Sequence, residues 1–111
     1  MQTEKGRLAP AQATRLDQCV EYASGAVVSK TLLKEEKGTL TLFAFDEGQG
    51  LSEHTAPFNA VVQILDGSAV LVIGGKDVPA STGDIVLMPA NVPHAVKAPK
   101  PFKMLLTMIR K

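Results

Sequence analysis

The stretch GLSEHTAPFNAVVQILDG, residues 50–67, contains the pattern on which the prediction of the architecture depends. It places His54 beside a proline-bearing turn, after which comes the apolar run of residues 60–65. An apolar run of this length between turn residues is typical of a β-strand covered on both faces. A second stretch, GDIVLMPANVPHAVKA (residues 83–98), repeats the order of strand, turn and histidine with His94. The repetition predicts that both histidines converge on one pocket.

Length and composition indicate one domain with an apolar core. The chain has 111 residues, 45% of them hydrophobic, and its 12 Lys and Arg nearly balance 11 Asp and Glu. A net charge of +1 does not provide the excess of positive charge that binding to nucleic acid or anionic lipid requires. No segment approaches the ~20 apolar residues of a membrane helix, and the N-terminus lacks the apolar run of a signal peptide. We therefore expect a cytoplasmic protein with neither nucleic acid nor membrane as a partner.

The N-terminal residues lack a regular hydrophobic period. Residues 1–13 predict a mobile tail or a strand-like arm that orders by packing, and residues 14–111 a single barrel domain. Thr14 is placed to cap a short helix through Leu16 and Val20 that ends near Gly25. The single cysteine, Cys19, has no thiol partner, and a packing role is favoured over a redox role.

From residue 26 onward the apolar residues alternate with period two, and turn residues recur every eight to twelve positions. This pattern predicts an all-β jelly roll or small barrel of about nine strands. Residues 39–45 are expected to bury one face, and Asp66-Gly67 to form a turn between two strands. The strands whose bounds the sequence predicts are residues 27–33, 39–45, 60–65, 69–73, 85–88, 94–98 and 102–109.

The last predicted strand is apolar on both faces. Residues 104–109 have one polar member, Thr107. One face can line the interior, and the other needs a covering sheet or a second subunit. We therefore expect a homodimer, with sheet-on-sheet packing as the alternative.

The first histidine stretch resembles the first part of the two-part motif of the cupin superfamily. Gly48, His54 and Gly67 match the opening glycine, the first histidine and the closing glycine of that motif. Ala56 and Ala60 stand where the family has its second histidine and its glutamate. The resemblance implies a jelly-roll barrel, or double-stranded β-helix, with its core motif region at residues 39–109.

The second stretch matches the second part of the motif more fully. Gly83, Pro89 and His94 have the family's spacing. Asn91 replaces a glycine, and Ala98 replaces an asparagine. Asparagine can adopt the left-handed backbone conformation that such a turn requires.

Cupins usually hold a metal through three histidines and one glutamate, so the resemblance implies a site for one divalent transition metal at His54 and His94. Mn, Fe, Ni and Zn are not distinguished by two imidazoles. Gln63, Asn59 and Glu53 are the available third ligands. Gln63 and Glu53 point outward if the strands are regular, although a β-bulge would change that parity. For Gln63, a hydrogen bond between strands or at an interface is the other interpretation.

The remaining pocket lining is predicted to be apolar, and each of its residues also suits the core. The methionines among them are common gap-fillers. The predicted lining comprises Val62, Ile64, Leu71, Met88, Val96, Phe102, Met104 and Leu106.

Three functions remain open at this point. One is a metal-dependent oxygenase, isomerase or lyase acting on a small organic molecule, with acid–base chemistry at His54 or His94. Another is a metal-free cupin that binds or senses a small-molecule ligand, suggested by Ala56 and Ala60. The third is a barrel that serves as a dimerisation scaffold, because cupin-like barrels host many activities. Tyr22 is assigned to packing.

Overall fold

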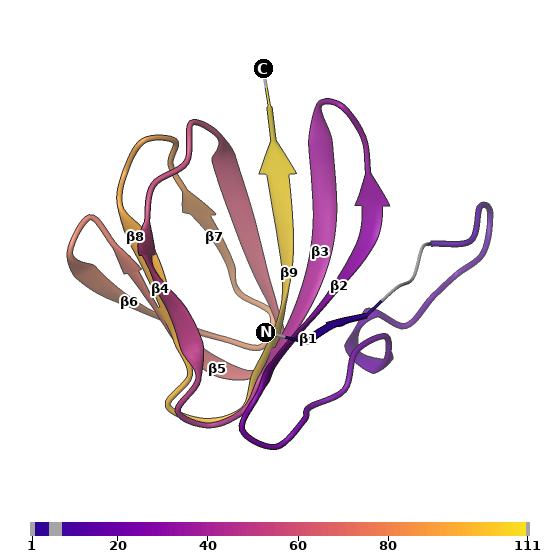
Figure 1. Ribbon diagram of the computed structural model, residues 1–111, viewed down its shortest axis with the longest axis horizontal. Helices are drawn as coiled ribbons and strands as arrows, with labels where there is room; N and C mark the ends of the chain where they lie inside the picture. Colours follow the sequence, from indigo (N-terminus) through magenta and orange to yellow (C-terminus); the bar gives the residue numbers. More distant parts are fainter. Residues whose placement is uncertain (1, 5–7, 111) are drawn as a thin grey trace.

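The computed structural model describes residues 2–4 and 8–110, which form two curled sheets facing each other across an apolar core (Figure 1). This architecture confirms the predicted all-β jelly-roll barrel. Its elements in chain order are β1 (Gln2–Glu4), the 3₁₀ turn η1 (Leu16–Gln18), β2 (Val27–Lys34), β3 (Gly38–Phe45), β4 (Gly50–His54), β5 (Asn59–Ile73), β6 (Lys76–Ser81), β7 (Ile85–Met88), β8 (His94–Lys97) and β9 (Phe102–Ile109).

The long strand β5 belongs to both sheets. Its first half pairs with β7 and β9, and β9 continues the sheet through β3 and β2 to β1. Its second half pairs with β6 and β8, and β8 pairs with β4. In Figure 1 the two sheets diverge upward from a common lower edge where β5 bends. The path of β5 therefore sets how the sheets face each other.

The predicted turn at Asp66-Gly67 is wrong, because the strand continues through it with a bulge. The pairing of β5 with β9 shifts by one residue between Ile64 and Asp66. Before the shift the inward side chains include Val62 and Ile64, and after it they include Leu71. The extra residue thus reverses the alternation, so that both halves direct apolar side chains into the same core.

Gly67 follows the bulge, opposite Phe102, in a backbone conformation that favours glycine. Its φ is +75°, and a Cβ there would lie 2.3 Å from the backbone oxygen of Pro101. The turn before β7 bonds to the same corner, since the Thr82 amide donates to the Gly67 carbonyl and the Gly83 amide to that of Ile64. Gly74 and Gly75, both at positive φ, form the two-residue turn of the hairpin between β5 and β6.

The N-terminal segment covers the outer face of the larger sheet. Val20 is 1% exposed and packs with Leu42 and Leu105 in a second apolar cluster outside the barrel. Strand β3 is therefore buried on both faces, with Phe43 and Phe45 in the barrel core, and the prediction of one buried face is wrong. Leu105 of β9 is covered by the N-terminal segment of the same chain. This cover is neither the second sheet nor the second subunit that was considered for β9.

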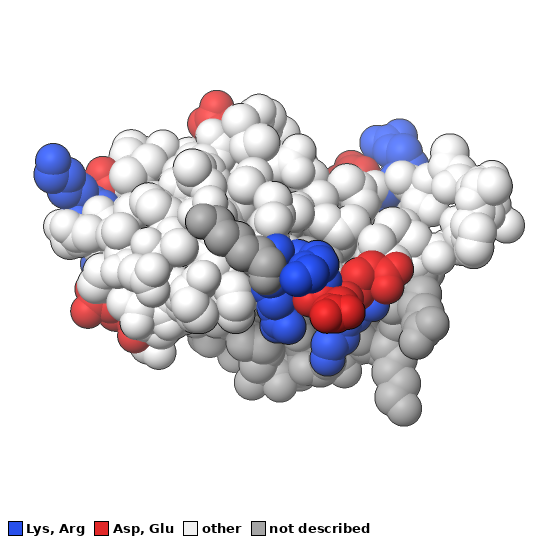
Figure 2. Space-filling model, turned by 90° about the horizontal axis from the view of Figure 1, so that it is seen from above, with Lys and Arg blue, Asp and Glu red and all other residues white. Residues whose placement is uncertain are grey.

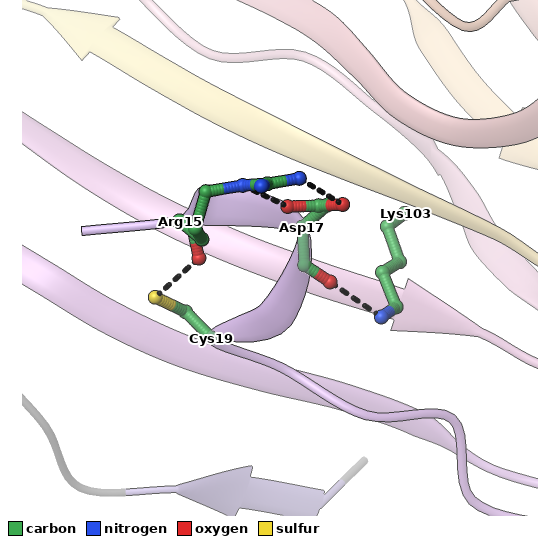
Figure 3. Close-up of polar contacts among 4 residues, drawn as sticks. All are labelled: Arg15, Asp17, Cys19 and Lys103. Atoms are coloured by element: carbon green, nitrogen blue, oxygen red, sulfur yellow. Dashed lines mark hydrogen bonds and ion pairs between the residues drawn. The ribbon is translucent and has the colours of Figure 1, made fainter.

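The helix predicted from Thr14 to about Gly25 is reduced to the turn η1. Its N-cap, Arg15, makes no side-chain capping hydrogen bond. Polar contacts hold the turn instead: the Arg15 side chain lies 3.4 Å from the Asp17 carboxylate, and Cys19 Sγ donates to the Arg15 carbonyl (Figure 3). Lys103 of β9 donates to the Asp17 carbonyl at 2.6 Å, which ties the turn to the sheet. Cys19 is a half-buried free thiol, in keeping with a packing role.

The strand-like arm expected within residues 1–13 is present in part. Strand β1 pairs in parallel with residues 28–30 of β2, and the Leu8 amide donates to the Leu32 carbonyl. Residues 1 and 5–7 of this arm, together with residue 111, lie outside the described part of the chain.

Four large apolar side chains remain exposed on the described strands of the larger sheet, among them Leu33 of β2 at 44%. Ile85 and Leu87 of β7 are 65% and 55% exposed, and Ile109 of β9 is 53% exposed. The homodimer stays a prediction.

No helix in residues 2–4 and 8–110 is long and apolar enough to cross a membrane.

We predict that Gly67→Ala lowers the free energy of unfolding by several kcal/mol, because it adds both backbone strain and a collision with Pro101. Gly75→Ala is the matched control, since its φ is +80° and no atom lies within 4 Å of the added Cβ. That variant should lose only the conformational term of about 1–2 kcal/mol. Urea unfolding of both variants measures the difference. Equal losses would show that the close approach at the bend is unimportant.

We predict that Tyr22→Phe removes a loss of stability at alkaline pH. The Tyr22 hydroxyl donates to the Asp66 carboxylate at the bend of β5. Burial, followed by that hydrogen bond and the charge of Asp66, raises the pKa of Tyr22 above its ordinary value. The contribution is therefore complete below about pH 10 and declines as pH rises above it. Urea unfolding at pH 8 and above pH 10 should show a smaller decline for the variant; parallel declines would exclude this role.

Candidate functional site

A bulge in β4 turns His54 into the barrel. Leu51 pairs with Val96 and His54 pairs with His94, so two residues of β4 between these pairs oppose one residue of β8. In a regular strand residues 51 and 54 would point to opposite faces, whereas here both line the interior. The extra residue is what brings the last side chain of β4 over the barrel mouth.

The loop between β7 and β8 positions His94. Asn91 has a φ of 63°, which is the left-handed conformation predicted for it. Its amide donates to the Ala56 carbonyl at 2.8 Å, and the Ala90 amide donates to Asn59 Oδ1 at 3.0 Å. These bonds tie the loop to the segment that follows His54. The two histidine stretches are thus held together at one end of the barrel.

The two imidazoles meet edge to face. His54 Nε2 and His94 Nε2 are 3.1 Å apart, and the ring centroids are 4.3 Å apart at an interplanar angle of 70°. His94 is 5% exposed, whereas His54 lies on the solvent side. The structure therefore brings together the two residues that the sequence identified. His94 borders the pocket from inside the barrel, and His54 borders it at the mouth.

The outer nitrogen of each ring faces a backbone carbonyl. His54 Nδ1 lies 3.0 Å from the Ser52 oxygen, and His94 Nδ1 lies 3.2 Å from the Val92 oxygen. A carbonyl oxygen only accepts, so each of these contacts is a hydrogen bond in the tautomer that carries its hydrogen on Nδ1. When both rings are in that tautomer, both Nε2 atoms present lone pairs to each other. At 3.1 Å the two Nε2 atoms can share either a hydrogen, donated by one ring to the other, or a metal ion that binds both.

A small cavity of about 50 Å³ adjoins the pair. Cavities that enclose organic ligands typically measure about 300–1,000 Å³. This volume suits an ion with a few water molecules, and a larger ligand would have to sit across the mouth. The lining is formed by Leu51, His54, Ala56, Ala60, Met88, His94, Val96, Met104, Leu106 and Met108.

Half of the apolar residues predicted to line the pocket do so. Met88, Val96, Met104 and Leu106 face the cavity. The other four are buried in the barrel core below it, with exposed fractions of 0–2%: Val62, Ile64, Leu71 and Phe102. The prediction overlooked Leu51, which depends on the bulge in β4, and Met108, which the apolar pattern of β9 does contain.

The proposed third ligands do not face the cavity. Gln63 is exposed on the outer face of β5, opposite Ile85 and Leu105, so the prediction of Gln63 as a metal ligand is corrected. Glu53 is exposed within the bulge, and Asn59 uses its side-chain oxygen to hold the β7–β8 loop. Within residues 2–4 and 8–110, no three His, Cys, Asp or Glu side chains are grouped to hold an ion. Among the described residues that line the cavity, His54 and His94 are the only His, Cys, Asp or Glu side chains.

The end of the molecule seen from above carries few charges. In Figure 2 most of this face is white, and Lys, Arg, Asp and Glu gather mainly in one mixed group. Larger hollows of about 470 and 480 Å³ border residues 49–52 on the outside, but they are open to solvent and contain neither histidine. The histidine cavity is therefore the site with the clearest chemistry.

Comparison with known proteins places this architecture in a family. The family model for the cupin domain matches residues 41–109, which contain both histidine stretches. No functionally curated protein matches the sequence significantly.

Three solved structures extend the match. A conserved protein of unknown function from Streptococcus pyogenes is 32% identical, with a TM-score of 0.88 over 94% of this chain and 91% of that one. A cupin 2 conserved barrel domain protein from Leptotrichia buccalis is 37% identical, with a TM-score of 0.82 over 85% of this chain and 46% of that one. A cupin superfamily protein from Desulfitobacterium hafniense is 25% identical, with a TM-score of 0.87 over 94% and 95%. The protein described here belongs to the cupin family.

Proposed function

We propose that this protein is a cation-binding cupin that holds one metal ion at His54 and His94 and accepts a small ligand at the barrel mouth. The observation that carries the proposal is the pair of Nε2 atoms 3.1 Å apart, in two rings whose Nδ1 atoms both lie within hydrogen-bond distance of a backbone carbonyl. An ion between them replaces the repulsion of two lone pairs by two attractive contacts.

The distance between the two nitrogens allows a shared ion. Imidazole nitrogens bind first-row metals at ~2.0–2.1 Å, so two such bonds can meet at one point when the nitrogens are 3.1 Å apart. The backbone carbonyls of Ser52 and Val92 fix the tautomer and orientation of each ring, as partners of metal-bound histidines commonly do. The donors therefore fit a metal ion, although two protein ligands leave most of its coordination shell open.

The open coordination positions define the chemistry. A bound metal acts as a Lewis acid that polarises an oxygen or nitrogen of a ligand. The chain's own residues would orient that ligand: His54 from the solvent side, and Met88, Met108 and Leu106 through an apolar wall. The cavity excludes all but a small part of an organic molecule, so a ligand would place one polar group inside and the rest at the mouth.

We predict that His54→Ala lowers metal affinity at least tenfold, because it removes one of two protein ligands. His54 is exposed, so the substitution should leave the fold intact. Gln63→Ala is the control, since it changes an exposed side chain on the outer face of β5. Metal content after loading and desalting, together with thermal unfolding, measures the effect. A metal at a hundred times its dissociation constant should stabilise the parent protein by ~2.7 kcal/mol.

Two other outcomes would redirect the proposal. If metals leave the parent protein unchanged and a small organic compound stabilises it, the metal-free binding function replaces this one. If neither metal nor organic ligand binds and the protein is dimeric by light scattering, the dimerisation scaffold is favoured. The exposed Ile85 and Leu87 of β7 would then be the first positions to substitute.

A further inference from the structure

We infer that the ion best suited to this site is a soft monovalent cation, Cu(I), held by His54, His94 and a methionine thioether. This inference rests on the proposed function, because it concerns the identity of the ion at the same two histidines. Its basis is the position of Met88 and Met108 around Ala60, the residue that replaces the family's glutamate.

The ladder of the larger sheet places both methionines beside Ala60. Ala60 is the Cα partner of Met88 on β7 and of Met108 on β9. All three side chains line the cavity. Two methionines thus flank the position at which a cupin usually supplies a carboxylate, so thioether ligands are available there in place of a hard ligand.

The same residues lie at the histidine end of the barrel. Met88 ends β7, Met108 is next to last in β9 and Ala60 is second in β5, while His54 ends β4 and His94 begins β8. In Figure 1 these strand ends all lie toward the upper, open end of the molecule. Sulfur and imidazole donors are therefore gathered around one small cavity.

Charge also favours a monovalent ion. No carboxylate lines the cavity, which is otherwise formed by apolar side chains. Desolvating an uncompensated charge is costly, and the cost rises steeply from a monovalent to a divalent ion. Thioether and imidazole are neutral ligands, and soft sulfur ligands select Cu(I) over the harder divalent metals. The donor set therefore fits Cu(I) better than the divalent ions that the resemblance implies.

Competition binding of the full chain to Cu(I) under anaerobic conditions tests this inference. Cys19 is another soft ligand, so all proteins carry Cys19→Ser, which retains a hydrogen-bond donor for the Arg15 carbonyl. The expected result is one Cu(I) per chain, bound at least a hundredfold more tightly than Zn(II) or Mn(II) and displaced by Ag(I). Copper X-ray absorption should show both nitrogen and sulfur bound to the metal.

The decisive variants are Met88→Leu and Met108→Leu, separately and combined. Leucine conserves most of the volume of methionine, so the core should remain packed. Met104→Leu is the matched control: it also lines the cavity but pairs with Ile64, four residues or ~13 Å along β9 from Met108. We expect the double variant to lose at least tenfold in Cu(I) affinity and to lose the sulfur signal, while Met104→Leu stays within twofold.

The outcomes separate this inference from the proposed function. If His54→Ala weakens Cu(I) and Zn(II) but the double variant binds Cu(I) like the control, the histidine site stands and the thioether role is refuted. Zn(II) binding as tight as Cu(I) in the parent protein refutes the inference in the same way. If His54→Ala changes the affinity of no metal, both the inference and the proposed function fail. Thermal unfolding of each variant confirms that losses of affinity reflect the site.

Discussion

The packing of Gly67 against the backbone of Pro101 is the constraint on which the two sheets depend. Strand β5 runs from one sheet into the other, and at its bend there is no room for a side chain between the strand and the segment that begins β9. The bulge at this point also reverses the alternation of side chains. Both halves of one strand can therefore supply apolar residues to a single core, which closes the barrel beneath the histidines.

A second bulge has the same effect on a polar residue. In β4 it turns His54 inward, where it faces His94 across a ladder pair. The loop that carries His94 is held by the left-handed Asn91 and by its bond to the Ala56 carbonyl. Backbone geometry, rather than the side chains around the site, thus sets the distance between the two rings. The alanines at positions 56 and 60 leave a small cavity whose remaining polarisable groups are sulfur atoms.

The N-terminal segment gives the larger sheet its second covered face. Val20 and Leu105 meet outside the barrel, while Lys103 and Tyr22 lie close enough for a cation–π contact of 5.0 Å. Tyr22 also bonds to Asp66 at the bend of β5. One short segment therefore packs on the outer cluster and on the corner of the barrel at once. This arrangement explains why strands β3 and β9 are apolar on both faces.

The amino-acid sequence by itself determined the all-β class, most strand positions and the two histidines, because alternating apolar residues and turn residues act locally and the motif spacing is a property of the chain. The tertiary structure decided which way the chain turned at its irregular points. Bulges at residues 51–54 and 64–66, and the cover over Leu105, depend on partner strands distant in sequence. A shift of one residue reverses which face a side chain occupies, so only the assembled sheets could place both Leu51 and His54 inside the barrel.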